Sequence, residues 1–226
     1  MLNMLPQCAG RWPMAIPLPH SATSALVAAL LLSSGHQVAA GDTTYAVDAG
    51  KSSVVVHVGK EGVFSFAGHE HVVRAPRLQG EILAAADDLS RSRVTLSFET
   101  AALRVQEKGE PEGDAAKVQE AMLGPEVLAA SRFPTVTFKS RTVAGKTAAQ
   151  GAHDLTITGD LSLHGVTRSV TLPLHVEVGG DTLKASGRLV LRQTEYGIKP
   201  VTVAGVVKVK DELVIEYAFV ATKARR

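Results

Sequence analysis

Cysteine is almost absent from this sequence. The 226 residues include only Cys8, which precedes the apolar run of residues 25–32 and so cannot be the lipid-modified cysteine that would follow such a run. The chain beyond residue 40 therefore has no thiol. It can form no disulfide, no catalytic thiolate and no cysteine metal cage, and an oxidising compartment cannot harm it.

Acidic residues are absent from residues 1–40, where Arg11 is the only Lys or Arg. The apolar run in this segment is shorter than the about 20 residues that a bilayer-spanning helix needs, and it leads into Val38-Ala39-Ala40, a small-residue cleavage site. We therefore predict a cleaved secretory signal peptide over residues 1–40, with Met14 as an alternative start of translation. A retained anchor helix is the alternative, but no basic stop-transfer cluster follows the run.

Tryptophan, net charge and catalytic motifs are also scarce. The only tryptophan is Trp12, which disfavours a classical lipocalin or a biotin-binding barrel. The 24 Lys and Arg nearly balance the 22 Asp and Glu, so no basic surface for nucleic acid is expected.

Neither Gly-x-Ser-x-Gly nor His-Glu-x-x-His occurs, and we interpret Gly145-Lys146-Thr147 as a turn and Asp87-Asp88 as solvated turn residues. We predict a protein that is not an enzyme and that needs no cofactor.

Alternation of apolar and polar residues is what the sequence has in abundance, and it is clearest over residues 154–178. In both arms of this stretch alternate residues are apolar, which is typical of strands with one buried face. The segment His164 to Arg168 contains Gly165 and predicts the turn of a long β-hairpin. Pro173 in the second arm requires an edge, a bulge or a neighbouring strand that leaves its position unpaired.

Similar segments predict an all-β fold for residues 41–226, which are enough for a single domain with its own core. They are separated by Gly, Asp and Lys clusters and favour a barrel or a sandwich; they cover residues 45–47, 52–58, 63–74, 78–85, 93–99, 135–139, 183–191 and 212–220.

One insertion, around residues 114–129, has a helical pattern instead. Asp114 can cap a short helix that ends at Gly124, and Pro125 can open a second helical turn. The charged residues 107–113 before it predict a mobile loop.

Four motifs together resemble the YceI-like family of bacterial polyisoprenoid-binding proteins. They are, in chain order, Tyr45-Ala46-Val47-Asp48, Phe133-Pro134-Thr135-Val136-Thr137-Phe138-Lys139-Ser140, Gly159-Asp160-Leu161-Ser162-Leu163-His164-Gly165-Val166-Thr167 and Arg192-Gln193-Thr194-Glu195-Tyr196-Gly197-Ile198. The resemblance spans nearly all of residues 41–226. It implies an extended, lipocalin-like antiparallel β-barrel of about eight strands, exported to the periplasm, that holds an isoprenoid chain in a long apolar tunnel.

An apolar ligand of this kind can be bound without a dedicated polar anchor. Each methylene removed from water contributes roughly 0.8 kcal/mol, so about ten of them give about 8 kcal/mol before the costs of binding. A barrel of about eight strands has room for one slender ligand. The candidate wall residues are Phe64, Phe66, Phe98, Phe138, Leu161, Leu163 and Leu191. Each of them could equally fill the core of a barrel without a ligand.

Polar candidates for a ligand headgroup are fewer. Arg192, close to Tyr196 in sequence, could face the barrel mouth and bond a quinone carbonyl or a phosphate; such an arginine can also close a barrel end. His69 and His71 point to one face of a strand, and His71 is our headgroup candidate. The alternative is that His69 and His71 share a zinc or copper ion, or that both simply face solvent.

The sequence thus predicts a non-catalytic protein that binds, sequesters or transports an isoprenoid lipid or isoprenoid quinone in the periplasm. It has no stable membrane span and is a monomer or a homodimer. The rival interpretations are a metal-binding or redox-accessory protein that serves a membrane electron-transfer partner, and a stress-induced scaffold with a packed core.

Overall fold

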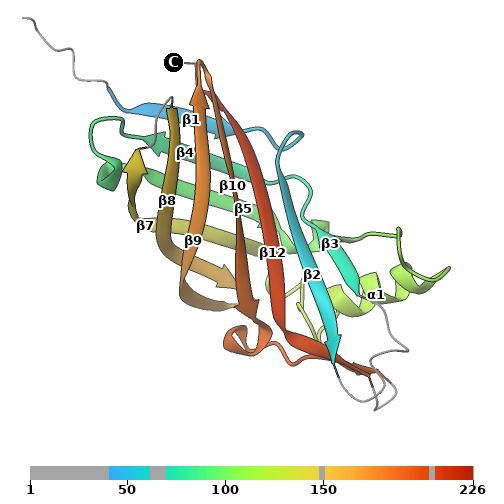
Figure 1. Cartoon of the computed structure of the whole chain (residues 1–226). Coiled ribbons are helices and arrows are strands. Elements are labelled where there is room, and N and C mark those ends of the chain that lie inside the picture. Colours follow the sequence, from blue (N-terminus) through green and yellow to red (C-terminus); the bar gives the residue numbers. More distant parts are fainter. Residues whose placement is uncertain (1–40, 62–69, 148–150, 204–206, 226) are drawn as a thin grey trace, which may run out of the picture. The chain divides into compact units, whose positions relative to one another are not determined.

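The segments in which apolar and polar residues alternate form β-strands, and these strands pair into a closed antiparallel β-barrel (Figure 1). The structure is a computed structural model that describes residues 41–61, 70–147, 151–203 and 207–225. Within these ranges the strands are β1 (Thr43–Val47), β2 (Ser53–Glu61), β3 (His71–Arg74), β4 (Gln79–Ala84), β5 (Arg93–Glu99), β6 (Arg104–Val105), β7 (Thr135–Thr147), β8 (Ala152–Leu163), β9 (Val166–Gly179), β10 (Thr182–Arg192), β11 (Thr202–Val203) and β12 (Val207–Lys223). The helices are α1 (Asp114–Leu123) and the short 3-10 helices η2 (Leu89–Arg91), η3 (Thr100–Ala102) and η5 (Gln193–Tyr196).

The barrel has eight positions, because three of them are each built from two strands. At the first position, β1 and β2 both pair with β12. At the second, β3 pairs with β2 and β4 pairs with β1. At the third, β6 pairs with β3 and β5 pairs with β4. β7, β8, β9 and β10 follow in chain order, and β12 closes the ring. All these pairs are antiparallel, which confirms the predicted fold.

The predicted hairpin consists of β8 and β9, and its turn is shorter than expected. Leu163 pairs with Val166, so His164 and Gly165 alone make the turn instead of residues 164–168. Both have positive φ, 51° and 75°, as a two-residue turn of type I′ requires. A Cβ on Gly165 would lie 2.4 Å from the ring of Phe133, so glycine is also needed for packing.

β9 and β10 pair with each other only as far as His175 and Ser186. We call the remaining parts of the two strands, residues 166–174 of β9 and 187–192 of β10, the seam. Pro173 lies where the seam begins, so its missing N–H costs no ladder hydrogen bond to β10. Its carbonyl instead accepts a hydrogen bond of 2.7 Å from the hydroxyl of Tyr217 on β12. Tyr217 reaches across β10 at Gly187, where a Cβ would lie 2.1 Å from the Pro173 oxygen. The neighbouring strand thus leaves Pro173 unpaired, as its presence requires.

α1 covers a second interruption of the barrel wall, next to β6. β7 begins opposite the end of β5, so among the described strands β6 pairs with β3 alone. Gln119 of α1 takes the place of a strand: its Oε1 accepts from the N–H of Val105 and its Nε2 donates to the carbonyl of Leu103, both at 2.8 Å.

The helical insertion is shorter than predicted. Gly124 is the C-cap that terminates α1, as expected, but Asp114 is the first helical residue and Gly113, at φ 78°, is the N-cap. Residues 125–128 form turns and not the predicted second helical piece. The N–H of Leu128 donates to the carbonyl of Met122, so the chain folds back onto the end of α1.

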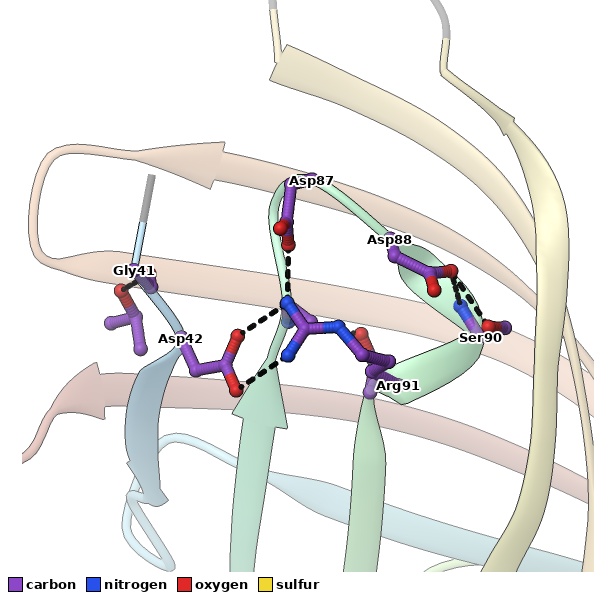
Figure 2. A network of polar contacts seen from close by, with 9 residues as sticks. Gly41, Asp42, Asp87, Asp88, Ser90 and Arg91 are labelled. Atoms are coloured by element: carbon purple, nitrogen blue, oxygen red, sulfur yellow. Dashed lines mark hydrogen bonds and ion pairs between the residues drawn. The ribbon is translucent and has the colours of Figure 1, made fainter. Parts of the chain in front are cut away.

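The turn between β4 and β5 is fastened by the carboxylates that we predicted to be turn residues. Figure 2 shows the Arg91 guanidinium between Asp42 and Asp87, with two hydrogen bonds to Asp42. Asp88 accepts from the N–H and the hydroxyl of Ser90 at 2.9 and 2.6 Å and caps η2. These bonds hold the pKa of Asp87 and of Asp88 below the usual range.

Two sequence interpretations need correction or fall outside the described residues. Gly145-Lys146-Thr147 is not a turn: it belongs to β7 and pairs with residues 153–155 of β8, because β7 is much longer than predicted. Of the strand predicted over residues 63–74, the structure describes β3, whereas residues 63–69 lie outside the described ranges.

Candidate functional site: the barrel cavity

The barrel encloses an apolar cavity of about 310 Å³, at the lower end of the roughly 300–1,000 Å³ typical of ligand sites. It is lined by inward-facing residues of the strands and by residues of α1 and η5. Among the lining residues that the structure describes, all but four are apolar; the four are His71, Thr137, Gln193 and Tyr217. Because water gains few hydrogen bonds in such a space, hydrocarbon is the material that suits it.

One end of the cavity is closed by tightly packed side chains. Around β1 and β4 the interior is filled by buried residues that do not line the cavity; they are Tyr45, Ile82, Val143, Ile157, Leu174, Val176, Leu183, Ala185 and Ala221. The long tunnel that we predicted is therefore a blind cavity in this structure. Toward the other end it reaches Val201, which is 37% exposed, and Val209 beside it.

A buried carboxylate holds the polar wall residue His71 in place. His71 Nδ1 lies 2.8 Å from Glu110 Oε1, and the Glu110 side chain is only 2% exposed. A carboxylate so deeply buried needs a hydrogen-bonding or charged partner. The loop of residues 107–113, which we predicted to be mobile, is thus tied to β3 by this contact.

Gln193 is a second polar group on the wall. It is 6% exposed, and its Nε2 donates to the carbonyl of Lys210 at 2.8 Å. This bond fixes η5 against β12 on the side of the cavity where Val209 lies. His71 and Gln193 therefore offer polar contacts toward the open end, while the blind end offers hydrocarbon.

Most predicted wall residues lie where the sequence placed them. Five apolar candidates and one polar candidate line the cavity: Phe98, Phe138, Leu161, Leu163, Leu191 and His71. Phe64, Phe66 and His69 lie outside the described residues. Contact of any of these residues with a ligand stays a prediction.

Arg192 and Tyr196 do not line the cavity. Arg192 is exposed on the outer face of β10, where it pairs with Glu212 of β12 at 3.1 Å. The alternation of the strand explains this, because Leu191 before it faces inward. Tyr196 is fully buried behind the wall, its hydroxyl has no hydrogen-bond partner among the described residues, and burial raises its pKa to about 12. A ligand contact by either residue also stays a prediction.

Sequence reasoning missed the wall that α1 and the segment after it provide. Val118, Ala121, Met122, Val127 and Leu128 all line the cavity. The shared helix face of Val118 and Met122 was a usable signal, but nothing in sequence showed that this face would close a gap in a barrel.

The part of the chain that the structure describes contains no helix long and apolar enough to cross a bilayer. Within the same ranges, no group of three or more His, Cys, Asp or Glu side chains is arranged to hold a metal ion.

Comparison with known proteins gives one family and one fold. The sequence profile described as "YceI-like domain" matches residues 45–221. A "UPF0312 protein" of Shewanella denitrificans is 37% identical over 95 residues, which are 39% of this chain and 48% of that protein. The match thus spans about half the length of this relative.

Solved structures with the same fold are more distant in sequence. BcnA of Burkholderia cenocepacia has a TM-score of 0.61 at 19% identity, covering 78% of this chain and 99% of BcnA. A structure described as a polyisoprenoid binding domain from Saccharophagus degradans has a TM-score of 0.56 at 14% identity, covering 80% and 99%. At these identities the likeness concerns the fold.

Proposed function

Because this chain belongs to the YceI-like family, we propose that it binds, sequesters or carries an isoprenoid lipid or isoprenoid quinone and catalyses no reaction. The observation that carries the proposal is the cavity itself: a space inside a barrel, closed at one end, whose described wall is hydrocarbon apart from four residues. The neighbour described as a polyisoprenoid binding domain supports the same ligand class.

The shape of the cavity supports a defined orientation of the ligand. An apolar chain that enters at the open end gains roughly 0.8 kcal/mol for each methylene that it buries toward the packed end. A carbonyl or hydroxyl headgroup then stays near His71 and Gln193, where hydrogen-bonding groups compensate for its partial loss of water. We propose that the ligand binds with its tail toward the blind end.

Export is part of this proposal. The apolar run and cleavage site in residues 1–40 support a periplasmic protein, in which the absence of thiols beyond residue 40 is no disadvantage. N-terminal sequencing of the protein from the periplasm of its host should give Gly41 as the first residue. A first residue upstream of Ser33 would contradict the predicted cleavage.

Native mass spectrometry combined with solvent extraction tests the ligand. Protein purified gently from the periplasm of its own host should carry one prenyl lipid or quinone per chain. A bare protein would contradict the proposal, and a metal mass would favour the metal-binding alternative.

Leu189 and Val190 provide a matched pair of variants for the same experiment. Leu189 lines the cavity, whereas Val190 faces outward and is 55% exposed. Leu189→Trp should fill part of the cavity and remove most of the bound ligand, and Val190→Trp should leave it unchanged. Equal ligand retention in both folded variants would show that the ligand lies elsewhere.

A further inference from the structure

The open end of the cavity is bordered by an edge that combines exposed apolar surface with lysines. Val201 and Val209 line the cavity, and the N–H of Val209 donates to the carbonyl of Val201 at 2.9 Å. Val201 and Val190 are the exposed large apolar residues of the described chain, and only Val201 lies on the cavity wall. Lys199 lies two residues before Val201, Lys208 and Lys210 flank Val209, and all three lysines are exposed. We call Val201 with these three lysines the basic lip.

Among the described side chains, one lysine of the basic lip forms an ion pair and the other two do not. Lys208 pairs with Glu61 at 3.0 Å, but Lys199 and Lys210 make no ion pair within the described part of the chain. Asp211, the nearest acid along the chain, directs its carboxylate to η5, where it accepts from the N–H and the hydroxyl of Thr194 at 2.9 and 2.7 Å.

A buried carboxylate, that of Glu110, lies on the other side of the cavity mouth. The order of strands here is β11, β12, β2 and β3, and Glu110 is held by His71 of β3. At about 4.8 Å between neighbouring strands, β3 lies two steps, or roughly 10 Å, from β12 with Lys208 and Lys210, and three steps, or roughly 14 Å, from β11. Both separations exceed the Debye length of about 8 Å at physiological ionic strength, so Glu110 offsets the charge of the basic lip only weakly.

We propose that the basic lip docks the protein on an anionic phospholipid membrane, with the cavity mouth against the bilayer. Lysines near an anionic surface are attracted to it, and an exposed valine between them enters the headgroup region. The assignment rests on the proposed function, since only a membrane-derived cargo requires the mouth to meet a bilayer. Val201 belongs both to the lip and to the cavity wall, so a lipid would pass from the membrane into the cavity without crossing water.

Vesicle flotation tests the docking surface with two charge-matched double variants. The probes are vesicles of phosphatidylcholine with phosphatidylglycerol and vesicles of phosphatidylcholine alone, each at low and high salt. The test variant is Lys199→Gln with Lys210→Gln. The control is Lys184→Gln with Lys223→Gln, two exposed lysines of β10 and β12 near the packed end. All proteins are purified in the same way from the periplasm of the host, so they share one N-terminus and differ only in the substituted lysines.

The wild type should bind the anionic vesicles more tightly than the neutral ones, and salt should weaken that binding. Each lysine near such a surface contributes roughly a fivefold factor in affinity, so the lip variant should bind roughly 25-fold more weakly, and the control should match the wild type. Equal losses in both variants, or no preference for anionic vesicles, would overturn the docking surface.

Extraction of the same proteins, purified without vesicles, separates this proposal from the proposed function. Bound prenyl lipid in a wild type that ignores vesicles overturns the docking alone. Vesicle binding through the lip by a protein that never carries prenyl lipid would overturn the proposed cargo and leave the membrane surface standing.

Discussion

At the scale of single residues, the two most informative side chains are tyrosines with opposite hydrogen-bonding states. The Tyr217 hydroxyl donates to the Pro173 carbonyl at the seam, whereas the Tyr196 hydroxyl is buried with no partner among the described residues. Loss of a buried hydrogen bond that leaves a carbonyl unpaired costs about 1–3 kcal/mol, but loss of an unpartnered hydroxyl removes an unfavourable group.

Tyr217→Phe should therefore lower the free energy of unfolding by about 1–3 kcal/mol, and Tyr196→Phe should change it by less than about 0.5 kcal/mol or raise it. Urea denaturation of the two variants and the wild type gives this comparison. A larger loss in the Tyr196 variant would mean that its hydroxyl has a partner.

The raised pKa values of both tyrosines predict that the free energy of unfolding falls at alkaline pH. Burial raises the pKa of each from about 10 to about 12, so the folded state favours the neutral phenol. This stabilisation is fully present below pH 10 and is lost as the pH rises through about 12. The free energy of unfolding should fall less steeply over this interval in the double variant Tyr196→Phe, Tyr217→Phe than in the wild type. Parallel slopes would show that the two phenols titrate normally.

Gly187 is required by close packing at the seam. A Cβ there would lie 2.1 Å from the Pro173 oxygen and 2.6 Å from the Tyr217 ring, so Gly187→Ala should cost about 1–3 kcal/mol of unfolding free energy. Gly179 on β9 has no atom within 4 Å of an added Cβ, so Gly179→Ala is the control and should stay within about 0.5 kcal/mol of the wild type. Equal stability of the two variants would mean that the strands part easily at the seam.

At the scale of elements, α1 is a wall of the cavity that depends on one side chain. Gln119 satisfies two backbone groups of the Leu103 to Val105 segment, which has no strand on that side among the described residues. α1 also makes apolar contacts, and several of them come from residues that face the cavity.

Gln119→Leu should lower the unfolding free energy by about 1–3 kcal/mol because both backbone groups lose their partner. Amide hydrogen exchange at Val105 should become faster, and a bound prenyl probe should dissociate faster through the loosened wall. Lys117→Ala, on the exposed side of α1, is the control and should change none of these quantities. Unchanged exchange at Val105 in the Gln119 variant would show that the helix is held by its apolar contacts.

At the scale of the whole molecule, the barrel should be more stable with its cavity filled. A ligand present at 100 times its dissociation constant stabilises the folded state by about 2.7 kcal/mol, which raises the Tm of a protein of this size by roughly 5–10 °C. Solvent extraction should therefore lower the Tm, and addition of the extracted lipid should restore it. Leu189→Trp should show no such shift, and Val190→Trp should behave as the wild type. A Tm that is indifferent to extraction would favour a packed scaffold.

Much of the barrel could be predicted from local pattern. The hairpin over residues 154–178, the strand over residues 93–99 and the inward-facing Phe98, Phe138 and Leu161 follow from an alternation that each strand carries in its own residues. The resemblance of four motifs to one family supplied the closure of the sheet into a barrel, which periodicity alone left open. Turn lengths were less accurate, because His164 and Gly165 adopt positive φ that the residue pattern does not specify uniquely.

The limits of sequence reasoning lie where function depends on distant segments meeting. Alternation correctly places Leu191 inward and therefore turns Arg192 outward, yet the motif favoured Arg192 as a headgroup contact. The pairing of Glu110 with His71 joins residues 39 positions apart. The sequence determined the strands, their inward faces and the expected leader, because these depend on near neighbours in the chain. Only the tertiary structure decided that the cavity is blind, that α1 forms its wall and that lysines border its mouth, since these follow from contacts that no local pattern encodes.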